Sequence, residues 1–130
     1  MMVPLLFLAA TSADLDALNQ SVEHCNRKLA NPVFSAETGR RSQFMLDAFR
    51  EQETIVAARL ELAERRRTLR EATGAKGSDD ERSLAIAASQ IEDRQRALND
   101  RRMLEGIRRE AIDSMRRYFL AHCASGKDKS

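Results

Sequence analysis

The chain has 130 residues, of which 32% are charged, 42% hydrophobic and 5% aromatic, and its formal net charge is +2. This length predicts a single small domain, and the nearly balanced charge gives no strong field for nucleic acid or an acidic membrane. The sequence contains no glycine-rich phosphate loop, no HExxH and no GxSxG motif. We therefore predict that the protein is not an enzyme and needs no cofactor.

The first stretch, residues 1–13, has the composition of a secretory signal peptide. Its apolar run, Val3–Ala10, is too short to span a bilayer, and Thr11 and Ala13 are small enough for cleavage after Ala13. We predict export to the periplasm or secretion, and no membrane span. No Lys or Arg precedes the run. A weakly docked apolar N-terminus of a cytosolic protein is therefore the alternative.

A first helix is expected over residues 14–29, because five apolar side chains recur there at spacings of three and four. They are Leu15, Leu18, Val22, Cys25 and Leu29. We expect Asn31–Pro32 to end this helix, since the residue before a proline is pushed out of the α region.

A second helix is expected over residues 35–72, with an unusually wide apolar face. A face of this width suits two packing partners rather than one. Gly74 and Gly77 predict a turn after it, and Ser78 with Glu81 forms a capping box for the next helix. The residues of the wide face are Phe44, Met45, Ala48, Phe49, Ile55, Val56, Leu62 and Ala63.

A third helix is expected over residues 79–122, and its apolar pattern changes near Gly106. Before the change, one face carries Leu84, Ala88, Ile91 and Leu98. After it, a face rotated by roughly 160° carries Leu104, Ile107, Ala111, Met115 and Tyr118. Either the helix kinks near Gly106, or a straight helix meets two different partners, the second of them the first helix.

Together these elements predict an all-α fold in which residues 14–124 form a single three-helix domain. Its centre is a long antiparallel helical hairpin, coiled-coil-like, with the shorter N-terminal helix packed at the open end. Residues 125–130 are expected to form a disordered tail. The short first helix would leave apolar surface on the hairpin, which predicts a protein partner or self-association, for example as a homodimer.

The chain has two cysteines and two histidines, and each Cys directly follows a His. In an oxidising compartment an even number of cysteines predicts pairing, so we expect a Cys25–Cys123 disulfide. The alternative is a metal or redox site formed by His24, Cys25, His122 and Cys123. Adjacent residues on a helix point about 100° apart, which makes them poor paired ligands.

Arginines recur at seven-residue intervals in the third predicted helix. Such columns could bind an anion or nucleic acid. Acidic residues are interleaved with them at helical pairing distances, and no aromatic stacking platform accompanies them, so a solvated face is favoured and no nucleic acid is expected. The candidate anion-binding residues are Arg101, Arg102, Arg108, Arg109 and Arg116.

The sequence thus favours an exported, non-enzymatic helical interaction protein, either chaperone-like or a scaffold or adaptor, stapled by a disulfide. The first alternative is a metal or redox sensor that uses the two His-Cys pairs. The second is a cytosolic binder of anions or nucleic acid that uses the arginine columns.

Overall fold

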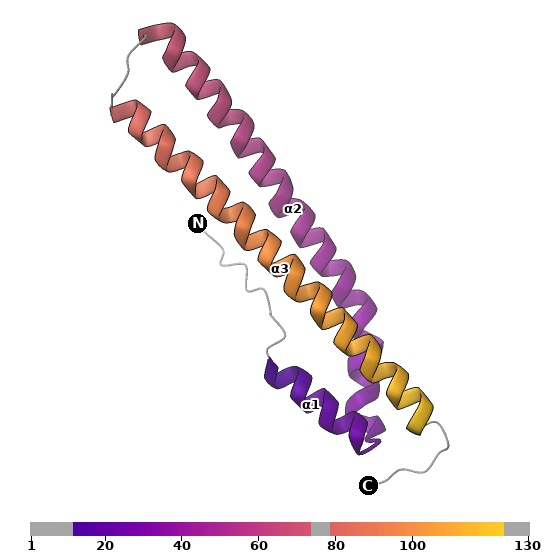
Figure 1. Ribbon diagram of the computed structural model, residues 1–130. Coiled ribbons are helices and arrows are strands. Elements are labelled where there is room, and N and C mark those ends of the chain that lie inside the picture. Colours follow the sequence, from indigo (N-terminus) through magenta and orange to yellow (C-terminus); the bar gives the residue numbers. More distant parts are fainter. Residues whose placement is uncertain (1–11, 74–78, 124–130) are drawn as a thin grey trace. The chain divides into compact units, whose positions relative to one another are not determined.

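A computed structural model of the chain describes residues 12–73 and 79–123. It contains three helices, α1 (Ser12–Glu23), α2 (Arg27–Thr73) and α3 (Asp79–Cys123), and no strand in that part of the chain (Figure 1). The predicted all-α hairpin with a shorter N-terminal helix is confirmed. Predictions on residues 1–11, 74–78 and 124–130 lie outside the described residues; they concern most of the signal peptide, the turn glycines, the capping Ser78 and the tail.

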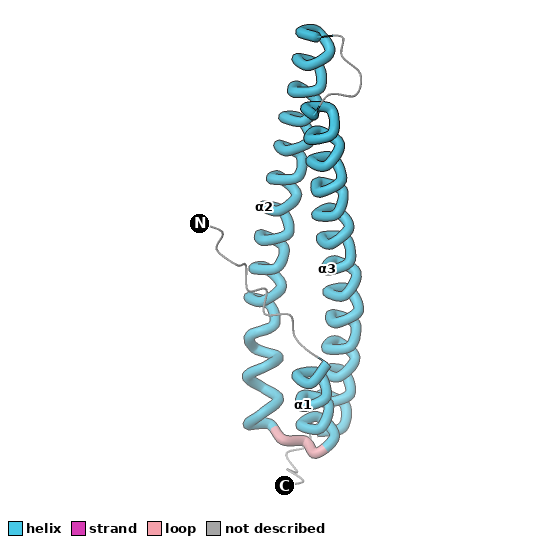
Figure 2. Tube along the Cα trace, turned by 90° about the vertical axis from the view of Figure 1, so that its left-hand side faces the viewer, coloured by secondary structure: helices cyan, strands magenta, loops and turns pink. Residues whose placement is uncertain are grey.

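The junction between α1 and α2 lies earlier in the chain than predicted, and Asn31–Pro32 does not end a helix. A short loop follows Glu23 instead (Figure 2), and Cys25 takes the left-handed backbone conformation with a φ of 50°. The Asn26 side-chain oxygen then accepts a bond from the Leu29 amide at 3.3 Å, which caps the start of α2.

Pro32 lies inside α2, in its second turn, so the predicted start of the second helix at residue 35 is wrong. Because proline has no amide hydrogen, the helix loses the bond that this position would donate to the carbonyl of Lys28. One missing bond so close to the helix start is tolerated, since the turn before it is already fixed by the cap and by core packing.

The chain divides into two compact units, and both long helices contribute to each. Of the described residues, the first unit comprises 12–40 and 107–123, and the second comprises 41–73 and 79–106. The prediction of a single domain over residues 14–124 stays a prediction.

In the first unit, all three helices supply side chains to one apolar core. Phe34 and Met115 pack against this core, and the rings of Phe34 and Phe119 lie 5.7 Å apart. The expectation that α1 is a partner of the second half of α3 is therefore confirmed. The buried residues are Leu18, Val22, Cys25, Ala30, Ile112, Phe119 and Cys123.

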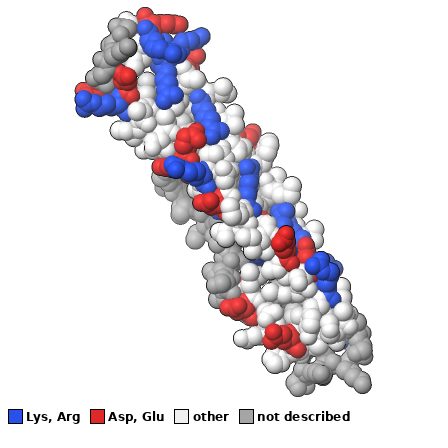
Figure 3. All heavy atoms as spheres, viewed as in Figure 1, with Lys and Arg blue, Asp and Glu red and all other residues white. Residues whose placement is uncertain are grey.

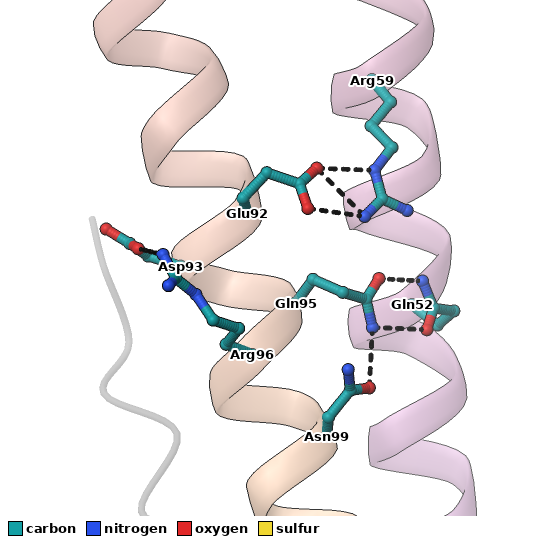
Figure 4. Close-up of polar contacts among 7 residues, drawn as sticks. All are labelled: Gln52, Arg59, Glu92, Asp93, Gln95, Arg96 and Asn99. Atoms are coloured by element: carbon teal, nitrogen blue, oxygen red, sulfur yellow. Dashed lines mark hydrogen bonds and ion pairs between the residues drawn. The ribbon is translucent and has the colours of Figure 1, made fainter.

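In the second unit, α2 and α3 pack through a narrow apolar seam flanked by polar pairs. Ala48, Ile55 and Leu98 are the buried cluster. Beside it the amides of Gln52 and Gln95 bond to each other at 2.8 and 3.1 Å (Figure 4). Apolar residues at seven-residue intervals with polar flanks are typical of coiled-coil packing, and the amide pair fixes the register.

The predicted second face of α3 is wrong for three of its five residues, although Met115 packs against the core of the first unit and Ala111 is half-buried. Leu104, Ile107 and Tyr118 are 65%, 58% and 46% exposed. The helix is uninterrupted at Gly106, and the buried side chains instead continue at every seventh position from the first face. The buried side chains are Leu84, Leu98, Glu105, Ile112 and Phe119, and Ile91, at the remaining position of the series, is half-buried.

Candidate functional site

The predicted disulfide between Cys25 and Cys123 is confirmed. The two residues are 98 positions apart in the sequence, and their Cα atoms lie 5.5 Å apart. Both side chains are buried. Arg27 adds a second link, because its Nη2 donates a hydrogen bond to the Cys123 carbonyl oxygen at 2.5 Å. The turn between α1 and α2 is thus fastened to the end of α3.

The two histidines lie beside the disulfide in sequence, but both side chains are exposed. The His122 ring stacks on Tyr118 with 4.0 Å between ring centroids. Both cysteine sulfurs are bonded to each other, and a thiolate is the form of cysteine that binds metal. In the parts of the helices that the structure places, no three His, Cys, Asp or Glu residues are grouped so that they could hold a metal ion.

The predicted arginine columns do not form one exposed cationic strip. In the second unit Arg102 donates to Gln52 at 3.3 Å, and Arg101 is half-buried. In the first unit Arg108 and Arg109 are half-buried, and Arg116 is exposed. Basic and acidic side chains alternate on the face drawn in Figure 3.

Two arginines at the seven-residue spacing of these columns, Arg94 and Arg108, have acidic partners on α2. Arg94 pairs with Glu51 at 2.9 Å, and Arg108 pairs with Glu37 at 2.8 Å. The sequence prediction placed the neutralising acids on α3 itself. Cross-helix pairs of this kind hold the two helices in register, so these arginines have a structural role in the fold.

A buried ion cluster in the first unit was not predicted. Glu37 is 7% exposed and accepts bonds from Arg108 Nη1 at 2.8 and 3.0 Å. It also accepts bonds from Arg40 Nε and Nη2 at 3.1 and 3.0 Å. A carboxylate removed from water to this degree needs such partners, because burying an unpaired charge is very costly.

Next to this cluster lies a groove of about 530 Å³ in the first unit. Most of its walls are apolar, and all three helices contribute to it. Its charged lining residues are Asp14, Arg40 and Arg108. The apolar lining includes Leu15, Leu18, Leu29, Val33 and Ile112.

In the second unit, α2 carries a row of exposed apolar side chains, here called the α2 stripe. It consists of Met45, Phe49, Val56 and Leu60, which are 63%, 62%, 45% and 68% exposed. At about 100° per residue these four lie within about 60° of one another around the helix. Clustering of this kind distinguishes the stripe from the single exposed apolar residues that any protein carries.

The wide apolar face predicted for this helix is only partly buried, and the α2 stripe includes part of its exposed side. Ala48, Ile55 and Leu62 from that face are buried, whereas Phe49 and Val56 are exposed. Packing against α3 thus uses one half of the wide face and leaves the other half open.

No helix in the described ranges is long and apolar enough to cross a membrane. The chain matches no protein-family model, no curated protein and no solved structure in the comparisons made.

Sequence reasoning missed the Glu37 cluster because the pairing of Glu37 with Arg108 depends on the register between two helices, which no local pattern gives. It missed the groove because the groove depends on α2 starting at Arg27, which places Leu29 and Val33 on the same helix as Arg40. The signal was Asn26, a good N-cap residue three positions before Leu29, but the proline after it received more weight.

Proposed function

We propose that this protein is an exported, non-enzymatic helical interaction protein that binds a partner polypeptide along the α2 stripe. The observation that carries the proposal is the half-used wide face of α2. Met45, Phe49, Val56 and Leu60 remain exposed beside a seam that already packs α3. Chaperone-like, scaffold and adaptor roles all require such a surface.

The shape of the stripe indicates the kind of partner. Four apolar side chains within about 60° of a helix surface suit an amphipathic helix or a second copy of this chain. Exposed aromatic and methionine side chains are favoured at binding surfaces, because they offer large and adaptable contact area. Phe49 and Met45 supply those two chemistries in the stripe.

The disulfide supports the exported location. Disulfides persist in oxidising compartments, whereas cytosolic thiols are kept reduced. Cys25 and Cys123 are both used in the bond, and within the placed residues no cysteine is free. Periplasmic or secreted localisation therefore belongs to the proposal, together with the predicted signal peptide of residues 1–13.

The test compares the wild-type chain with Phe49→Glu and Leu60→Glu variants. Sedimentation measures self-association, and light scattering measures aggregation of a chemically denatured client protein. We expect the wild type to self-associate or to suppress aggregation, and each glutamate variant to lose that property, because a charge placed on the stripe must be desolvated in the complex.

Thr54→Glu is the matched control. Thr54 is exposed on the same helix, about 120–180° around from the four stripe residues. It introduces the same charge outside the stripe, so the measured property should be retained. A wild type that neither self-associates nor protects the client, or glutamate variants that behave as wild type, would contradict the proposal.

A further inference from the structure

The groove of the first unit combines apolar walls with an incompletely paired arginine. Arg108 is one of its lining residues, and the side chain of Arg108 is 14% exposed. The volume of about 530 Å³ lies within the range of small-ligand sites, which runs from roughly 300 to 1,000 Å³. Sites of this class are mostly apolar, with a few polar groups that fix the orientation of the ligand.

The hydrogen bonds of Arg108 leave its best anion-binding edge unused. Both bonds to Glu37 come from Nη1, at 2.8 and 3.0 Å. Among the residues that the structure places, Nε of Arg108 is buried and has no partner. The Nε and Nη2 edge of a guanidinium is a planar fork that matches the two oxygens of a carboxylate or phosphate.

Nε itself has almost no accessible surface, so a ligand in the groove must reach Arg108 through Nη2, which makes no hydrogen bond within the described residues. A ligand with an anionic head would accept a charge-assisted hydrogen bond from Nη2 of Arg108, while Arg40, which is paired with Glu37, is a second cation that lines the groove. Asp14 also lines the groove and would repel that head. The anionic head is therefore placed at the arginines and the apolar tail along the remaining walls.

We propose that this groove binds a single-chain amphiphile with an anionic head group, a carboxylate or a phosphate. Leu15, Leu18, Leu29 and Val33 contact its tail, and Arg108 with Arg40 binds its head. The proposal does not depend on the α2 stripe, which belongs to the other unit.

The experiment is calorimetric titration of the full oxidised chain with dodecanoate and with dodecyl phosphate, both below their micelle concentrations. Dodecanol serves as the neutral control. We expect saturable binding of one molecule per chain for at least one of the two anions, which also distinguishes the two head groups. Dodecanol should bind about tenfold more weakly, because it lacks the charge-assisted bonds to the arginines.

Substitutions at two positions in the groove, Val33 and Arg108, localise the site. Val33 is 37% exposed, so both variants at this position are expected to fold. Val33→Glu should weaken binding of the anion about tenfold through charge repulsion and loss of apolar contact. Val33→Gln introduces a neutral side chain of nearly the same shape as glutamate, and should weaken binding much less. Arg108→Gln should weaken it about tenfold as well, and Arg96→Gln, an exposed change in the other unit, should have no effect.

The experiment tests the proposal even if Arg108→Gln fails to fold, because the comparison of Val33→Glu with Val33→Gln does not depend on that variant. Absence of saturable binding by both anions, equal affinity for dodecanol, or equal effects of Val33→Glu and Val33→Gln would overturn the proposal. A dimer in sedimentation that dissociates with Val33→Glu would assign the groove to a second copy of the chain, and would overturn it too.

Discussion

Glu37 and Arg108 form a buried ion pair although they are 71 positions apart in the sequence, with 2.8 and 3.0 Å between Arg108 Nη1 and the two carboxylate oxygens. The pair joins the first part of α2 to the last part of α3 within the first unit. Its side chains are 8% and 14% exposed, so water screens it little.

Breaking this pair is expected to destabilise the protein strongly. Glu37→Gln leaves the arginine charge buried without its counter-ion, and should lower the free energy of unfolding by about 3–5 kcal/mol. Urea denaturation followed by circular dichroism measures the change. Arg67→Gln is the control, since the Arg67–Glu64 pair on α2 is 60% and 61% exposed and should contribute about 0–1 kcal/mol. Equal effects of the two substitutions would refute this assignment.

The disulfide should stabilise the fold by closing a long loop. Cys25→Ser removes a link that closes a loop with a sequence separation of 98 residues, and should lower the free energy of unfolding by about 2–5 kcal/mol in non-reducing buffer. Wild type and variant should differ much less in excess reductant. If their urea midpoints already coincide without reductant, the link does not stabilise the fold.

The two halves of the wide α2 face should respond differently to truncation. Ile55 is fully buried in the second unit, so Ile55→Ala should cost about 2–5 kcal/mol through lost apolar burial and the cavity that remains. Its neighbour Val56 is 45% exposed, and Val56→Ala should change stability by less than about 0.5 kcal/mol in the isolated monomer. The same denaturation assay measures both, and a large loss at Val56 would place it in the core.

The two glycines inside the long helices should be replaceable. A Cβ built on Gly39 or on Gly106 meets nothing within 4 Å. Gly39→Ala and Gly106→Ala should therefore each raise the free energy of unfolding by about 0.5–1 kcal/mol, because alanine loses less backbone entropy in a helix. A raised melting temperature in thermal scans checks this. A lowered one at Gly106 would show that its lack of a side chain serves close packing or bending.

The fold class was predictable because the helical spacing of apolar residues and the expected disulfide both indicated the same arrangement of helices. Long amphipathic segments gave the hairpin, and the pairing of Cys25 with Cys123 gave the place of the first helix. The face of α3 was not predictable in the same way. Glu105 occupies the next position of the repeat after Leu98, so a charged residue interrupts an apolar pattern that the structure continues. The apolar neighbours Leu104 and Ile107 were therefore wrongly predicted to lie on a buried face.

The candidate site was predictable only in part, for reasons of long-range geometry. The wide face of α2 was visible in the sequence, but which half α3 covers depends on the register between two helices. Polar pairs such as Gln52 with Gln95 set that register, and no local pattern announces them. Predicting the groove requires the observed start of α2 at Arg27, but the rule that a helix ends before a proline placed a helix end at Pro32 instead.

The most direct test of the central claim is photocrosslinking from the α2 stripe. Benzoylphenylalanine placed at position 49 of the oxidised full chain is irradiated with either a second copy of the chain or the denatured client. We predict a covalent adduct from position 49 and little or none from position 54, which lies outside the stripe on the same helix. Equal crosslinking from both positions, or none from position 49, would contradict the claim that this surface binds a partner polypeptide.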